Sequence, residues 1–60
     1  MALTVMEVAK DLNISKFLVY KEIQEGRLSA FRVGKQQLRI KESELEAYKN
    51  RNKVEYMEEL

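Results

Sequence analysis

The segment from Ser15 to Gln24 combines residue types that can bind the edges of nucleic-acid bases. If the segment is helical, five of its side chains fall on one stripe; they are Lys16, Phe17, Tyr20, Lys21 and Gln24. Lysine can donate to guanine O6 and N7, glutamine can pair with adenine, and an aromatic edge can contact the methyl group of thymine. The pattern therefore predicts a helix that reads bases in the major groove of duplex DNA.

The N-terminal end of such a helix normally lies closest to the bases. Ser15, Lys16 and Phe17 occupy that end here. Ser15 is also a suitable donor to a phosphate group, which the positive end of the helix dipole attracts. We therefore expect the first turn to make the closest contacts with DNA.

The alternative for the two aromatic residues is burial beneath a third helix. Phe17 and Tyr20 would then belong to the core. We favour exposure, because Leu18, Val19 and Ile23 already supply the inward side of the helix. Both aromatic side chains are therefore predicted to face solvent or DNA.

A second group of polar and basic side chains surrounds a glycine turn. Its members are Arg32, Lys35, Gln36 and Arg39. Arginine and lysine on a hairpin beside a recognition helix can bind phosphates or enter the adjacent minor groove. We expect phosphate contacts from the two arginines and groove contacts from the two residues at the tip. The alternative is a solvated hairpin whose outer face is simply charged.

The charge distribution along the chain favours the DNA-binding interpretation. Residues 15–41 carry seven basic and two acidic side chains, a net charge of +5. Residues 1–14 carry −1 and residues 42–60 carry −3, so the whole chain has a net charge of only +1. A basic middle segment between acidic flanks indicates a nucleic-acid surface. Outside the two groups, we expect Lys10, Arg27 and Lys41 to be ordinary solvated side chains.

Helix signals at two places define the elements that must position these residues. Thr4 followed by Glu7 matches a capping box, which predicts a helix over about residues 5–12. Asn13 tolerates the left-handed conformation that ends a helix tightly. Ser15 is a good N-cap and Gly26 a good C′ residue, so a second helix is predicted from Lys16 to Glu25. Two short helices joined by about three residues have helix-turn-helix spacing.

The period changes from helical to alternating after Gly26. Phe31 and Val33 form one apolar pair, and Leu38 and Ile40 form another. A polar turn over residues 34–37 joins the two runs, which predicts a hairpin. We expect all four apolar side chains on the face that packs against the helices, and the arginines on the opposite face.

A third helix is predicted to begin near Glu42. Leu45 and Tyr48 are its expected core contacts. We therefore expect one domain over residues 1–50, followed by an extension over residues 51–60 that is helical or frayed and could contact a partner. The fold class is mainly α with a small β-hairpin, in the order α-α-β-β-α.

The sequence contains little that indicates catalytic activity. The chain has no cysteine and no histidine, which removes thiolate and imidazole groups as metal ligands or general bases. It has no glycine-rich phosphate loop and no nucleophile–base pair. Glu42, Glu44 and Glu46 suit the positive end of a helix dipole better than an acid–base site. We expect no enzymatic activity, no metal and no cofactor.

Membrane insertion is also not expected. The first residues lack the basic segment and apolar run of a signal peptide, and no stretch approaches the ~20 apolar residues of a membrane span. The sequence therefore predicts a cytoplasmic protein without a membrane partner.

The succession of motifs resembles that of the excisionase-type DNA-binding domains, small winged helix-turn-helix proteins related to the MerR group. The resemblance runs from residue 3 to about residue 50. The matching residues are Leu3-Thr4, Glu7-Val8-Ala9-Lys10, Leu12-Asn13-Ile14-Ser15, Val19-Tyr20-Lys21, Ile23, Glu25-Gly26-Arg27-Leu28, Ala30-Phe31-Arg32-Val33-Gly34-Lys35, Arg39-Ile40 and Leu45-Glu46-Ala47-Tyr48.

This resemblance implies a bacterial, phage or mobile-element protein that binds and bends duplex DNA beside recombination sites. Its partners would be DNA, further copies of itself on repeated sites, and an integrase that it steers towards excision. The positions carried over are Ser15, Lys16, Phe17, Tyr20 and Lys21 in the recognition helix, and Lys35 and Arg39 in the wing. MerR proteins proper carry a dimerisation coiled coil and an effector domain, which this sequence lacks, so no small-molecule effector is expected.

Two departures from the family pattern concern specificity and wing packing. Many relatives have a small polar residue where Phe17 stands and an aromatic residue near Gln37. Base preference could therefore differ here, and the wing could be less anchored.

Two other functions remain open at this stage. A small transcriptional regulator of the same fold would carry the same residues. A protein-interaction adapter could use Phe17, Tyr20, Tyr56, Met57 and Leu60 as a docking surface, but it gives no reason for the basic middle segment.

Overall fold

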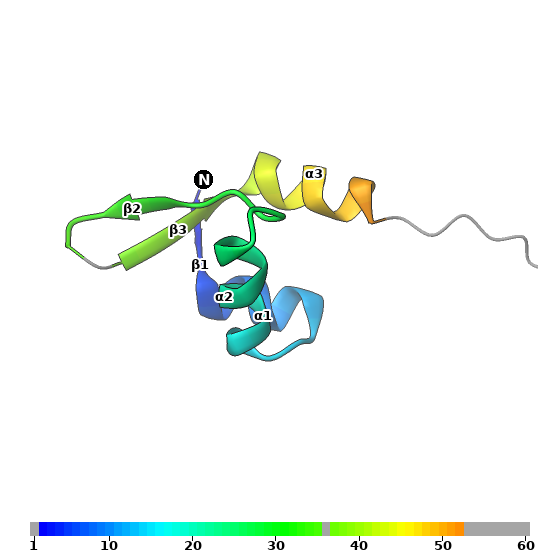
Figure 1. Ribbon diagram of the computed structural model, residues 1–60, viewed down its shortest axis with the longest axis horizontal. Helices are drawn as coiled ribbons and strands as arrows, with labels where there is room; N and C mark the ends of the chain where they lie inside the picture. The colour runs from blue at the N-terminus through cyan, green and yellow to red at the C-terminus, as the bar shows by residue number, and fades with distance from the viewer. Residues whose placement is uncertain (1, 36, 53–60) are drawn as a thin grey trace, which may run out of the picture.

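The computed structural model describes residues 2–35 and 37–52 of the 60-residue chain (Figure 1). Its elements are β1 (Ala2–Thr4), α1 (Val5–Leu12), α2 (Lys16–Gln24), β2 (Phe31–Val33), β3 (Gln37–Lys41) and α3 (Glu42–Arg51). β1 was not predicted, because three residues are too few to show alternation. The predictions for Gln36 and for residues 53–60 lie outside the described residues.

Capping interactions fix the ends of α1 as the sequence predicted. The Thr4 backbone N–H donates to Glu7 Oε1 at 2.9 Å, and the Glu7 N–H donates to Thr4 Oγ1 at 3.0 Å. This is the reciprocal capping box. At the other end Asn13 has φ 58°, the left-handed conformation that closes the helix. The prediction for both ends is therefore confirmed.

Similar local signals position α2. Ser15 is its N-cap, and the Leu18 N–H donates to Ser15 Oγ at 3.2 Å. The helix ends one residue earlier than predicted, with Glu25 as C-cap and Gly26 at φ +83°. Because only residues 13–15 separate α1 from α2, the two helices pack against each other at a tight turn.

The three strands form an antiparallel sheet in the order β1-β3-β2. The pairing register places Phe31 opposite Arg39 and Arg32 opposite Leu38. Directly opposed residues share one face of a sheet. Phe31 therefore shares its face with Arg39, and Arg32 shares the other face with Leu38.

The predicted facing of the hairpin is therefore wrong for its first strand. Phe31 and Val33 lie on the outer face and are 40% and 43% exposed, whereas Ile40 is buried on the core face. Arg32 is on the face expected to be apolar, where it stays exposed. The physical reason is that a shift of one residue in register moves every side chain of a strand to the other face, and sequence alternation does not fix the register.

The core lies between the helices and the sheet. Its buried residues are Val5, Val8, Ala9, Val19, Leu28, Ile40 and Leu45. Leu12 and Ile14 pack against this cluster, and so do Ile23 and Tyr48, as predicted. The inward position expected for Leu18 is wrong, since 41% of Leu18 is exposed. Its neighbour Val19 takes the inward position because successive helical residues point about 100° apart.

A polar network joins the end of α2 to α3. Arg27 Nε and Nη2 donate to Glu22 Oε1 and Oε2, both at 2.8 Å, and the Tyr48 hydroxyl donates to Glu22 Oε1 at 3.1 Å. Arg51 Nη2 donates to the Arg27 carbonyl oxygen at 2.6 Å. Arg27 also pairs with Glu25 at 2.7 Å. Arg27 is exposed, as expected, but its side chain is paired with Glu22 and Glu25. The Glu22 carboxylate and the Arg27 carbonyl oxygen make the contacts to α3.

This network makes stability depend on the charge of Glu22. Hydrogen bonding by Arg27, helped by Tyr48, holds the pKa of Glu22 below its ordinary value of 4.5. A group with a lowered folded-state pKa stabilises the fold above its unfolded pKa, and this contribution is lost as pH falls through the folded pKa. We expect Glu22→Gln to lower Tm at pH 7, and the difference from the unsubstituted protein to shrink below about pH 4.5.

Thermal unfolding followed by circular dichroism from pH 7 to pH 3 measures this difference. Tyr48→Phe is the matched variant, since it keeps the ring in the core and removes only the hydroxyl bond to Glu22. It should reduce the pH dependence by less than Glu22→Gln does. A constant offset in Tm across the whole pH range would show that the charge of Glu22 is not the source.

Candidate nucleic-acid interface

The outer face of α2 presents the side chains that the sequence singled out. Phe17 is 72% exposed and Tyr20 is 45% exposed, so the predicted exposure of both is confirmed. Lys16, Lys21 and Gln24 are also exposed. Their proposed contacts with DNA remain predictions.

Lys16 and Phe17 form a pair at the first turn of α2. The Lys16 ammonium nitrogen lies 5.6 Å from the centre of the Phe17 ring, within the range of a cation–π interaction. Ser15, whose hydroxyl oxygen accepts the Leu18 N–H, fixes the backbone of the same turn. A cation and an apolar ring are thus held side by side at the end of α2 that should approach the bases.

The hairpin contributes cations in two different settings. Arg32 and Lys35 are exposed near its tip. Arg39 is half-buried, and its guanidinium donates to the Leu38 carbonyl oxygen at 2.9 Å and to Gln37 Oε1 at 3.0 Å. Both acceptors are neutral, so the charge of Arg39 stays available to a phosphate while its position is restrained.

A surface hollow of about 240 Å³ lies between the first residues of β3, the start of α1 and α2. Residues from four elements, β1, α1, α2 and β3, line it, namely Thr4, Val5, Met6, Tyr20, Gln37, Leu38 and Arg39. It brings Tyr20 of α2 and Arg39 of β3 to one place, which no short sequence motif could indicate. Met6, which is 56% exposed here, and Gln37 were not predicted as site residues. Gln37 and Arg39 are two residues apart on a strand, so they lie on the same face. This spacing is the signal from which Gln37 could have been predicted.

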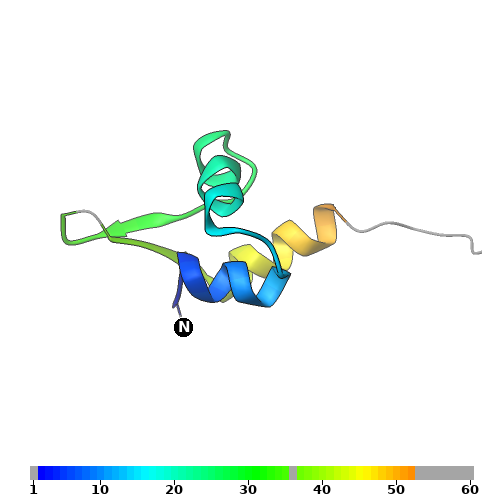
Figure 2. The same ribbon diagram turned by 90° about the horizontal axis from the view of Figure 1, so that it is seen from below.

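Five cations on α2 and the hairpin have no carboxylate partner among the described residues. Within residues 2–35 and 37–52 no carboxylate forms an ion pair with Lys16, Lys21, Arg32, Lys35 or Arg39. Figure 2 shows the hairpin extending to one side of the body and α2 standing out beside it, with α3 on the side opposite the hairpin. The two elements therefore frame a corner, and both carry cations without a carboxylate partner among the described residues; Arg32 and Arg39 lie on opposite faces of the hairpin.

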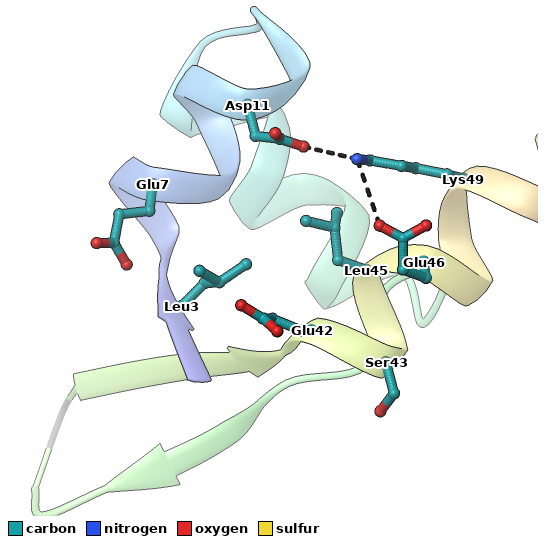
Figure 3. A pocket seen from close by; sticks show the side chains of 8 residues that line it. All are labelled: Leu3, Glu7, Asp11, Glu42, Ser43, Leu45, Glu46 and Lys49. Carbon is teal, nitrogen blue, oxygen red and sulfur yellow. Dashed lines mark ion pairs between the residues drawn. The ribbon is translucent and has the colours of Figure 1, made fainter. Parts of the chain in front are cut away.

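A groove of opposite charge lies between α1 and α3 (Figure 3). It measures about 530 Å³, and the carboxylates of Glu7, Asp11, Glu42 and Glu46 line it. Lys49 crosses one end, 2.8 Å from Asp11 Oδ2 and 3.7 Å from Glu46 Oε2. Carboxylates repel DNA phosphates, so this groove is excluded as the DNA-binding face. It includes no group of three acidic side chains that could hold a metal ion, nor does the rest of the described chain.

Helices of the described residues are all too short or too polar to cross a membrane.

Comparison with known proteins gives two matches. The family model described as a helix-turn-helix domain matches residues 2–53. An uncharacterized protein of Bacillus subtilis (strain 168), YvgK, is 48% identical over 46 residues, a segment that covers 77% of this chain and 15% of YvgK. The chain therefore spans only a small part of that relative. No solved structure matches the chain.

Proposed function

This chain belongs to the helix-turn-helix domain family, and we propose that it binds double-stranded DNA with α2 in the major groove and the β2–β3 hairpin as a wing on the adjacent backbone. The observation that carries the proposal is the corner between α2 and the hairpin, whose cations have no carboxylate partner among the described residues. Phosphates of DNA would supply the missing negative charge.

The two elements would have different tasks. Base contacts fall to α2, through Ser15, Lys16, Phe17, Tyr20, Lys21 and Gln24. Backbone or minor-groove contacts fall to the wing, through Arg32, Lys35, Gln36 and Arg39. Phosphate contacts set the position of the protein on the duplex, and base contacts choose the sequence. Binding requires no chemistry at the DNA, so we propose a protein that acts by binding alone.

Selection of binding sites from random duplex DNA tests the proposal. One module of this size buries about 600–1,000 Å² against DNA, so we expect modest affinity per molecule and a short selected motif. A repeated motif would show that several copies bind together. Failure to bind any duplex at low salt, measured by fluorescence anisotropy, would contradict the proposal.

Within this function, an excisionase role is the more specific proposal, and transcriptional regulation is the alternative. The resemblance to excisionase-type domains over residues 3 to about 50 supports the first. An excisionase should bend its site, which a fluorescence-transfer measurement between labelled DNA ends can detect. A site that stays straight and overlaps a promoter would favour the regulator.

Removing the charge of Arg39 should weaken binding to every duplex by a similar factor. Arg39→Ala removes one phosphate contact, so the slope of log K against log salt should become less steep by about one unit. Lys49→Ala is the matched control, because it deletes the same charge from the acidic groove, where Lys49 pairs with Asp11.

Anisotropy titrations of a selected and an unrelated duplex at several salt concentrations measure both slopes. An unchanged slope for Arg39→Ala, or an equal change for Lys49→Ala, would contradict the wing contact.

A further inference from the structure

Phe17 is the most exposed large apolar side chain of the described structure, at 72%. Its neighbour Leu18 is 41% exposed, whereas Val19 is buried. The ring therefore stands outside the core and contributes little to the burial that holds the fold together. Packing in the core therefore does not account for a phenylalanine at this position.

The setting of Phe17 restricts what the ring can touch. It is the second residue of α2, directly after Lys16, whose ammonium lies 5.6 Å from the ring centre. In the proposed complex this turn approaches the base edges. A base that accepts from Lys16 and a group that touches Phe17 would then belong to the same or neighbouring base pairs, since bases stack about 3.4 Å apart.

The floor of the major groove offers one apolar group, the C5 methyl of thymine. The N and O atoms there are hydrogen-bond donors or acceptors, which an aromatic ring cannot satisfy, and the ring C–H groups of the bases are smaller than a methyl group. We propose that Phe17 makes binding depend on a pyrimidine C5 methyl group beside the base that Lys16 contacts. This inference rests on the proposed binding of α2 in the major groove.

Deoxyuridine is the probe for this contact, because it differs from thymidine only by the missing C5 methyl and pairs in the same way. Each thymine of the selected site is replaced in turn, and affinities are measured by anisotropy. Burying one methyl group supports a loss of about three- to tenfold at one position. In Phe17→Ala the same replacement should change the affinity less than twofold.

Tyr20→Ala is the matched control, since it removes another exposed aromatic side chain from the same helix. It should retain the full loss on replacement of that thymine. Phe17→Ala should keep the Tm of the unsubstituted protein, because the ring lies outside the core.

Three results would overturn the inference while leaving DNA binding intact. They are a selected site without thymine, a site whose thymines all tolerate deoxyuridine, and an equal methyl effect in Phe17→Ala. The last would show that the methyl group contacts another side chain. A site whose thymines all tolerate deoxyuridine would leave Phe17 as a wedge between bases or a contact for another protein. Absence of binding to any duplex would instead remove the proposed function together with this inference.

Discussion

Replacing Lys16 by alanine is expected to weaken binding to the selected site by about 1–3 kcal/mol, roughly five- to 150-fold, and to leave unrelated duplexes much less affected. Lys16 is exposed at the first turn of α2 and forms no ion pair among the described residues. Its loss should therefore leave the fold intact and remove a donor to guanine. Anisotropy titrations with selected and scrambled duplexes give the ratio of the two affinities.

Lys10→Ala is the matched control for this experiment. Lys10 is an exposed lysine in the last turn of α1, outside the proposed interface. It should lower both affinities slightly and leave their ratio unchanged. If Lys16→Ala lowered both affinities by the same factor, Lys16 would be a phosphate contact and the assignment of base reading to this turn would be wrong.

The second large effect concerns the core. We expect Leu28→Ala to cost about 2–5 kcal/mol of the free energy of unfolding, the range for deleting a buried leucine side chain. Leu28 is 1% exposed and fills the core from the segment between α2 and β2. A chain of this length has a total stability of only about 3–9 kcal/mol. The substitution should therefore leave a large fraction of the protein unfolded at 37 °C.

Urea unfolding followed by circular dichroism measures this loss. Leu18→Ala is the matched control, because it makes the same chemical change at a leucine that is 41% exposed. It should cost much less. Equal losses for the two variants would mean that burial in the described core does not set the stability.

The sequence predicted those features that short-range signals determine. Thr4, Ser15 and Gly26 each mark a helix end through a hydrogen bond or a backbone conformation within a few residues. The stripe on α2 follows from helical spacing alone. These predictions hold because a cap or a stripe needs no knowledge of distant segments.

Features that join distant segments were not predicted. The facing of Phe31 depends on its pairing with Arg39, and β1 exists only because it pairs with β3. The contact between Arg51 and Arg27 spans 24 residues. In the candidate site, the hollow shared by Tyr20 and Arg39 likewise depends on how α2 packs beside the sheet. Local patterns carry no information about these relations.

The acidic groove between α1 and α3 also bears on how the molecule reaches a duplex. Because its net charge is only +1, the chain as a whole is attracted only weakly to the polyanionic duplex. Its charges are nevertheless sorted, with carboxylates on one side and unneutralised cations around α2 and the hairpin. Such a molecule has an electric dipole moment. The field of DNA exerts a torque on it that turns the acidic side outward before contact, so that a greater share of diffusional encounters begins in a productive orientation.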